Sequence, residues 1–219
     1  MSGETPLQGR LDQRRAAQNA EVRAAYEAMM AEIARAGAGG QVIAEGAGFP
    51  DFMLPNAEGG LVALADLLAQ GPLVVTFFRG DWCPYCRLTL EALAAALPEI
   101  EAAGGSLVAV TPETGGRALD AKLRHGARFE VLSDVDCGLG MLCGVVFRTP
   151  EVYRALLLRH GTDLAERHGN AAWWLPIPAS FVLDRQGIVR WRFVSLDFTR
   201  RAEPTAIVAA LRTMALPGG

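Results

Sequence analysis

Apolar residues recur with a helical period near the start of the chain. Residues 11–36 are expected to form a helix whose apolar face carries Val22, Tyr26, Met29, Met30 and Ile33. This face suits either a helix docked on its own domain or an arm that pairs two subunits. The run AGAGG at 36–40 is typical of a linker. We therefore divide the chain into an N-terminal helical extension with its linker, 1–40, and a domain, 41–219.

Strand-like and helical runs alternate after the linker. Residues 73–78 are apolar without polar alternation, as in a central strand buried on both faces. A long helix over about 84–103 and a second buried strand at 106–111 follow, which predicts a right-handed βαβ unit. The further expected strands are 51–55, 61–64, 129–132, 179–184 and 188–194, the last two joined as a hairpin with a bulge, and the further helices are 116–125, 150–160 and 203–214. This order predicts an α/β, thioredoxin-like fold, with a central mixed β-sheet flanked by helices.

Composition limits the class of protein. The 219 residues are 51% apolar and 21% charged, which excludes a mainly disordered chain, and a net charge of −3 gives no sign of a nucleic-acid or anionic-membrane partner. No apolar run reaches the length that spans a bilayer, and the N-terminus lacks the apolar segment of a secretory signal. We therefore expect a cytoplasmic protein, in which four cysteines serve redox chemistry, a metal or core packing.

The strongest chemical signal is a Cys-x-x-Cys pair between a buried strand and a helix. Pro84 suits the first helical turn, so the helix dipole would lower the pKa of a nearby thiol from about 8.5 toward 7 or below. Cys83 and Cys86 would lie one turn apart on one face, so that one sulfur can attack a mixed disulfide or sulfenic acid formed at the other. Arg79 and Arg87 flank the pair and are candidates to favour the thiolate.

The alternatives to a redox pair are a zinc site and two core cysteines. Zinc would need two further ligands, and Cys137 and Cys143 lack the spacing of a second half-site, so we expect no metal. These two cysteines would face different ways on a helix, and Gly138 and Gly140 make a regular helix there doubtful. Small buried residues are the favoured interpretation for both, with a resolving thiol as the alternative.

Several stretches resemble the peroxiredoxin-like AhpC/TSA family. The segment FRGDWCPYC at 78–86 is similar to that family's active-site segment, and further similar stretches are 51–55, 132–134, 175–187 and, for an atypical branch, 197–204. The resemblance spans about residues 48–213. It implies a thioredoxin-like fold, a redox-active cysteine pair and no cofactor.

The same segment departs from the usual peroxiredoxin pattern, Pro-x-x-x-Thr-x-x-Cys. Arg79 stands in the Pro position, Cys83 in the Thr position and Cys86 in that of the cysteine that attacks peroxide. A later arginine that holds the peroxide would fall at Pro178. Ile-Pro-Ala-Ser before a strand instead resembles the cis-proline loop of thioredoxins. The resemblance thus implies a peroxiredoxin-like frame around a thioredoxin-like centre.

Three functions follow from this interpretation. The first is reduction of a hydroperoxide, with Cys86 oxidised and Cys83 condensing with it. The second is exchange with a protein disulfide, with Cys83 attacking and Cys86 resolving. Both end in a Cys83–Cys86 disulfide that a thioredoxin-like protein or a small thiol reduces. The third is a non-catalytic redox sensor that uses the N-terminal helix as an interface, and a homodimer stays open.

Other side chains carry weaker expectations. Trp82 and Tyr85 would form an apolar rim around the cysteines or pack in an ordinary way. Trp173 and Trp174 would line a groove beside Pro178 or pack in the core or an interface. Surface positions are expected for three histidines and for charged residues before the last helix, namely His125, His160, His168, Asp197, Arg200 and Arg201.

Overall fold

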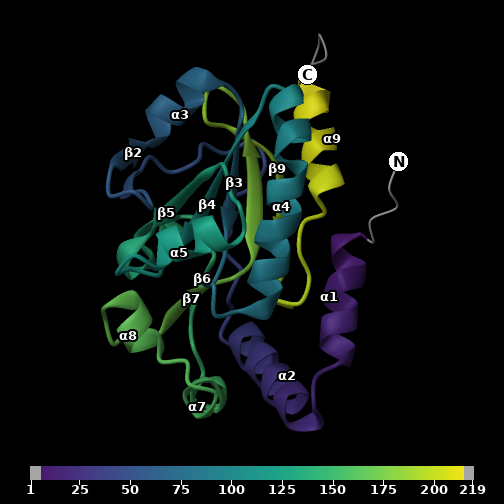
Figure 1. Cartoon of the computed structure of the whole chain (residues 1–219), viewed down its shortest axis with the longest axis vertical. Helices are drawn as coiled ribbons and strands as arrows, with labels where there is room; N and C mark the ends of the chain where they lie inside the picture. Colours follow the sequence, from purple (N-terminus) through teal and green to yellow (C-terminus); the bar gives the residue numbers. More distant parts are fainter. Residues whose placement is uncertain (1–5, 215–219) are drawn as a thin grey trace.

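A five-stranded mixed sheet forms the centre of the molecule, as expected. The computed structural model describes residues 6–214 (Figure 1). The strand order is β5-β4-β3-β8-β9, with β3, β4 and β5 parallel and β8 and β9 antiparallel to their neighbours. The strands are β3 (Leu73–Phe77), β4 (Ser106–Thr111), β5 (Glu130–Ser133), β8 (Ala179–Leu183) and β9 (Val189–Val194).

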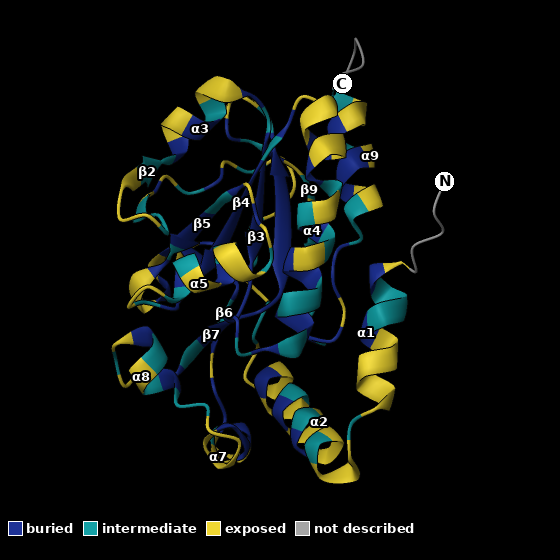
Figure 2. Ribbon diagram, in the orientation of Figure 1, coloured by how far each residue is buried: buried dark blue, intermediate teal, exposed yellow. Residues whose placement is uncertain are grey.

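Burial explains the apolar character of the central strands. All five residues of β3 are buried, because helices cover the sheet (Figure 2). Helix α4 (Pro84–Ala102) is the crossover between β3 and β4, and it lies alongside the last helix, α9 (Pro204–Met214). A register shift between Val182 and Leu183 marks the expected bulge in the β8–β9 hairpin. The predicted βαβ unit and bulged hairpin are confirmed.

Shorter elements surround this centre. The predicted helices near 116–125 and 150–160 are present. The elements that were not predicted include α3, α8 and the antiparallel pair β6–β7. The bounds are β1 (Met53–Pro55), β2 (Leu61–Ala63), α3 (Leu64–Gln70), α5 (Arg117–Arg124), η1 (Val135–Cys137), α6 (Gly138–Leu142), β6 (Val146–Arg148), α7 (Glu151–Arg159), α8 (Leu164–His168) and β7 (Trp174–Pro176).

The N-terminal segment forms two helices, so the single helix predicted over 11–36 is wrong. Helix α1 (Leu7–Ala16) and helix α2 (Ala20–Arg35) are separated at Asn19. The Asn19 side chain accepts a hydrogen bond of 2.8 Å from the backbone N–H of Val22, which caps α2 and fixes its start. Helix α1 packs on α4 and α2 packs on α7, so both dock on their own chain (Figure 1).

The doubt about a helix at Gly138 and Gly140 is also corrected. Helix α6 forms because the Asp134 carboxylate accepts hydrogen bonds of 2.9 Å from the backbone N–H groups of Leu139 and Gly140. A side chain at Gly140 would collide with Val146, whose methyl lies 2.7 Å from the Cβ position. The glycine therefore permits close packing here. Within the described part of the chain, no helix combines the length and apolarity needed to cross a membrane.

Candidate active site

The Cys-x-x-Cys segment lies where β3 ends and α4 begins. The N–H of Phe78 bonds to the Val110 carbonyl at 2.9 Å, which extends the β3–β4 pairing up to the motif. Cys83 is the N-cap residue of α4, and Pro84 occupies its first turn. Both Cys83 and Cys86 are buried. The structure therefore confirms that the cysteine pair lies at the junction between a strand and a helix.

Arg79 contacts Cys83 directly. Its Nη2 donates to Cys83 Sγ at 2.9 Å and its Nη1 donates to the Tyr153 hydroxyl at 3.1 Å. The guanidinium carbon lies 4.0 Å above the Phe198 ring, and Arg79 is only 1% exposed. A buried guanidinium needs compensating charge and hydrogen bonds, and a Cys83 thiolate supplies both.

Arg201 reaches the second cysteine. Its Nη2 lies 3.6 Å from Cys86 Sγ, and its Nη1 donates to the carbonyl groups of Phe198 and Arg200. Arg201 is buried, so the expectation of a solvated charge is wrong at this position, whereas Arg200 is exposed. The segment before α9 folds back over α4 and turns Arg201 inward. Each sulfur of the pair thus has its own arginine.

The two thiols have opposite pKa shifts. Burial acts to raise the pKa of Cys83, but hydrogen bonds from Cys86, together with Arg79 and Arg201, outweigh it and hold the pKa well below its usual range. Burial raises the pKa of Cys86 well above its usual range, and its bond to Cys83 and the negative charge there add to the effect. These directions favour a thiolate on Cys83 and a neutral thiol on Cys86 in the reduced centre.

A buried carboxylate braces the loop before Cys83. The backbone N–H of Asp81 donates to Glu113 Oε2 at 2.8 Å, and Arg167 Nη1 lies 2.8 Å from Glu113 Oε1. Gly80 has φ of +137°, and a Cβ there would lie 2.6 Å from Glu113 Cδ. Only glycine at position 80 allows this close approach without displacing the Glu113 carboxylate.

Arg87 does not lie beside the sulfurs. Its Nε donates to the Asp81 carbonyl and lies 3.5 Å from Asp81 Oδ1. Arg124 Nη1 and His125 Nε2 also reach the Asp81 carboxylate, at 2.9 and 2.7 Å. This competing carboxylate draws Arg87 away from the thiolate. The His125 side chain is 3% exposed, so the expected surface position is wrong for it.

Pro178 lies at the same edge of the sheet as the motif. Phe77 pairs with Ala179, which places Pro178 beside the end of β3. The described chain contains no cis peptide bond, so the expected cis-proline loop is absent. Pairing on both sides of Pro178 keeps the segment extended, since β7 precedes it and Ser195 N–H bonds to its carbonyl at 3.2 Å.

The aromatic residues of the motif have different places. Tyr85 is fully buried and packs edge-to-face on Phe198 at 5.6 Å between ring centres, so it belongs to the core and not to a rim. Trp82 is partly exposed, and its ring lies 5.2 Å from the Arg79 guanidinium carbon. Trp173 is buried with Arg154 over its ring at 4.6 Å, which fits packing better than a groove.

The remaining cysteines and histidines lie apart from this chemistry. Cys137 and Cys143 are buried, and burial raises both pKa values strongly. His168 is 2% exposed, so its expected surface position is wrong as well, whereas His160 is exposed. Residues 6–214 contain no cluster of three or more His, Cys, Asp or Glu that could hold a metal ion.

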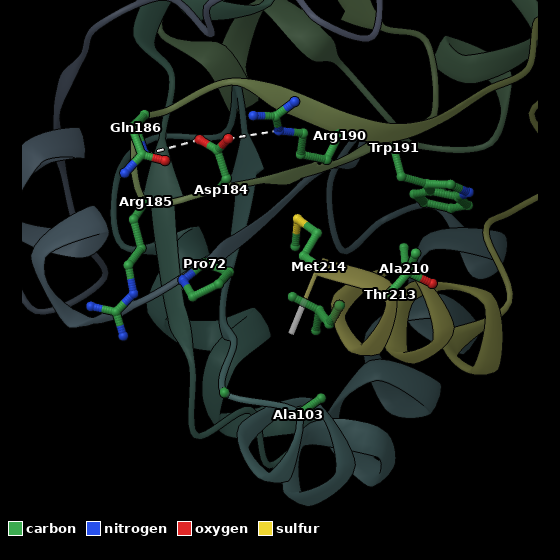
Figure 3. Close-up of a pocket in the computed structure, with 12 residues that line it drawn as sticks. Pro72, Ala103, Asp184, Arg185, Gln186, Arg190, Trp191, Ala210, Thr213 and Met214 are labelled. Atoms are coloured by element: carbon green, nitrogen blue, oxygen red, sulfur yellow. Dashed lines mark hydrogen bonds and ion pairs between the residues drawn. The ribbon is translucent and has the colours of Figure 1, made fainter. Parts of the chain in front are cut away.

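Two cavities differ in how close they lie to the Cys83–Cys86 pair. One of about 630 Å³ lies at the β8–β9 turn and α9, where Asp184 pairs with Arg190 (Figure 3). It is lined by Ala103 and Gly104, just past the C-terminal end of α4, about 28 Å from Cys83 at 1.5 Å per residue. The other, of about 350 Å³, is lined by Trp82 and Pro84, the sequence neighbours of Cys83, and by Arg79, which contacts Cys83 Sγ.

Sequence reasoning missed three residues of this centre: Arg201, Tyr153 and Phe198. The resemblance of segment 197–204 to an atypical branch of the family is a usable signal for Arg201 and Phe198. No such signal existed for Tyr153, whose position on the buried face of α7 depends on tertiary packing.

Comparisons with known proteins agree with the observed fold. Residues 46–192 match the model of the AhpC/TSA family. Thiol-disulfide oxidoreductase ResA of Bacillus subtilis is 30% identical over 100 residues, which cover 45% of this chain and 55% of ResA, so the match spans about half of that relative. Peroxidoxin BcpB of Mycobacterium tuberculosis has a similar structure, with a TM-score of 0.59 and 20% identity over 78% of this chain and 97% of its own. Peroxiredoxin Q of Xanthomonas campestris has a similar structure too, with a TM-score of 0.57 and 22% identity over 80% of this chain and 98% of its own.

Proposed function

The chain belongs to the AhpC/TSA family, and from this premise we propose that it is a thiol peroxidase that reduces hydroperoxides with Cys83 and Cys86. The family and its structural neighbours support thiol-dependent oxidoreductase chemistry on a thioredoxin-like fold. The observation that carries the proposal is the contact of 2.9 Å between the Arg79 guanidinium and Cys83 Sγ. This contact stabilises a nucleophilic thiolate at the junction between β3 and α4.

In the first step the Cys83 thiolate attacks one peroxide oxygen. An S–O bond forms while the O–O bond breaks, so that the sulfur loses two electrons and the alkoxide or hydroxide leaves. That leaving group takes a proton from water or from a neighbouring acid. The product at Cys83 is a sulfenic acid.

In the second step Cys86 resolves the sulfenic acid. The Cys86 sulfur attacks Cys83 Sγ, an S–S bond forms, the S–O bond breaks and water leaves with the Cys86 proton. Arg201, 3.6 Å from Cys86 Sγ, favours the thiolate that develops in this step. A thioredoxin-like protein or a small thiol then returns two electrons and two protons to the pair.

This order differs from the one that motif alignment implies. Alignment places Cys86 at the peroxide-attacking position. The lowered pKa of Cys83 and raised pKa of Cys86 favour Cys83 instead, because the thiolate is the nucleophile. The cavity of about 350 Å³ is also lined by Arg79, whose guanidinium contacts Cys83 Sγ.

Single cysteine variants test the proposal. Peroxide consumption with a thiol donor should be lost in Cys83→Ser, whereas Cys86→Ser should accumulate a sulfenic acid that dimedone traps at Cys83. Cys137→Ala should behave like the wild type. No peroxide consumption by the wild type would overturn the proposal, and trapping at Cys86 in Cys83→Ser would overturn the assigned order.

Exchange with a protein disulfide is the second candidate, because a buried Cys83 thiolate beside an N-terminal helix end also suits attack on sulfur. The partial likeness to a thiol-disulfide oxidoreductase supports it. Insulin disulfide reduction distinguishes the two: rapid insulin reduction with negligible peroxide turnover would favour exchange, and the reverse would favour the peroxidase.

A further inference from the structure

A cavity lined in part by the redox motif has walls from three separate parts of the chain. Its volume is about 350 Å³, and it lies among the link between α1 and α2, helix α7 and the redox motif, elements that converge at the lower end of the molecule in Figure 1. The α1–α2 segment precedes residue 46, where the family match begins, so this wall is an addition to the family's common part.

One side of the cavity carries an unused hydrogen-bond donor. Arg79 lines the cavity, is 1% exposed, and has no partner for its Nε. Its other two nitrogens are occupied by the Tyr153 hydroxyl and Cys83 Sγ. A buried donor without a partner is costly, and a ligand held against Arg79 in this cavity can supply the missing acceptor. An oxygen atom that accepts from this Nε would be bound by the same guanidinium group that contacts Cys83 Sγ.

The rest of the lining combines apolar surface with positive charge. Val22, Leu156, Leu157, Trp82 and Pro84 supply an apolar wall. Among the described lining residues there is no carboxylate, and the ionisable ones are two arginines, one histidine and two phenols, namely Arg14, Arg79, His160, Tyr26 and Tyr153. Arg14 is exposed and Arg79 is buried, so one positive charge is open to solvent and the other lies deep.

We propose that this cavity binds an organic hydroperoxide that also carries a carboxylate, with the peroxide oxygens at Arg79 and the carboxylate at Arg14. The inference rests on the proposed peroxidase function and names its substrate class. The apolar body of the molecule lies against the wall between the two arginines. The O–O bond breaks at Cys83 as described above, and the carboxylate takes no part in the chemistry. Residues of α1 and α2 thereby select the substrate.

A matched pair of substrates tests this assignment. The para-carboxylate and para-carboxamide derivatives of cumene hydroperoxide have nearly the same size and differ in negative charge. The wild type should prefer the carboxylate in kcat/KM by about threefold, the effect of a partly exposed ion pair. In Arg14→Gln the ratio should fall to about one. In Arg35→Gln, an exposed arginine of α2 outside the cavity, it should stay at the wild-type value.

A second variant separates charge from space. Ala17 is exposed and lines the cavity, so Ala17→Phe should fill it and raise KM for both organic hydroperoxides relative to H₂O₂. Ala28→Phe, exposed on α2 but away from the cavity, is the control. Equal use of the two cumene substrates by the wild type, or a preference that survives Arg14→Gln, would overturn the inference. If the wild type consumes no peroxide at all, the proposed function itself fails, which is a different result.

Discussion

Arg79 Nη2 lies 2.9 Å from Cys83 Sγ, and both residues are buried. Burial alone would favour the neutral thiol, and the hydrogen bond with Cys86, the Arg79 contact and the Arg201 charge together favour the thiolate. The arginine is in turn held by the Tyr153 hydroxyl and the Phe198 ring. Nucleophilicity at Cys83 therefore depends on residues from α7 and from the segment before α9, far away in the sequence.

Replacing Arg79 tests this dependence. Arg79→Met should raise the pKa of Cys83 and slow its alkylation by iodoacetamide at pH 7 by roughly tenfold, the effect of losing a charge-assisted hydrogen bond of about 1.5 kcal/mol. The ultraviolet absorbance of the thiolate, followed against pH, gives the pKa of Cys83 independently. Arg87→Met is the matched control, because Arg87 flanks the motif but binds Asp81. Equal effects of Arg79→Met and Arg87→Met on the alkylation rate would show that the Arg79–Cys83 contact does not determine the reactivity of Cys83.

The lowered pKa of Cys83 also makes stability depend on pH. A folded pKa below the unfolded value of about 8.5 stabilises the reduced protein above that unfolded value, and the benefit disappears as pH falls through the folded pKa. The difference in unfolding free energy between wild type and Cys83→Ser should thus grow with pH toward 8.5, with a slope approaching about 1.4 kcal/mol per unit. Urea unfolding at several pH values under reducing conditions measures it. A flat difference would contradict a Cys83 thiolate.

The sheet and the crossover helix were predictable because they depend on local signals. Val74 and Val75 belong to a run whose every side chain is buried, and such a run needs no alternation. Pro84 marked the start of α4 correctly. The periodic apolar positions begin at Val22, so they do not mark the break before α2, although Asn19 is a strong N-cap residue.

The electrostatics of the site were not predictable in the same way. Arg201 is 115 residues from Cys86, and a charged residue before a helix is ordinarily solvated. Its burial results from packing between α4 and α9. Arg87 flanks the motif in the sequence and was a candidate to favour the thiolate, but in the structure it pairs with the Asp81 carboxylate. Long-range packing and competing charges decided both outcomes.

Arg201 should act on the resolving step. Arg201→Met removes the positive charge 3.6 Å from Cys86 Sγ and should lengthen the lifetime of the dimedone-reactive sulfenic acid at Cys83, on the order of threefold to tenfold. Arg200→Met, the exposed neighbour, is the control and should leave the lifetime unchanged. A shorter or unaltered lifetime in Arg201→Met would remove Arg201 from the mechanism.

His168 should make the fold sensitive to acid. Burial, with Arg167 and Arg117 nearby, lowers its pKa from 6.5 to about 4, so the folded state favours the neutral ring. Protonation of the unfolded chain then costs stability as pH falls from 6.5 to 4, by about 3 kcal/mol in total. His168→Gln should lose most of this acid dependence, which denaturant titrations between pH 7.5 and 4 would reveal. An identical acid profile in both proteins would rule the histidine out.

The account depends most on the two sulfurs of the motif forming one bond. Peptide mapping by mass spectrometry, after one equivalent of H₂O₂ is added to the reduced full-length protein, tests this directly. The predicted product is a Cys83–Cys86 disulfide, two hydrogen atoms lighter than the dithiol, with Cys137 and Cys143 still reduced. A sulfinic acid at either motif cysteine, a bridge to Cys137 or Cys143, or an unoxidised motif would contradict the account.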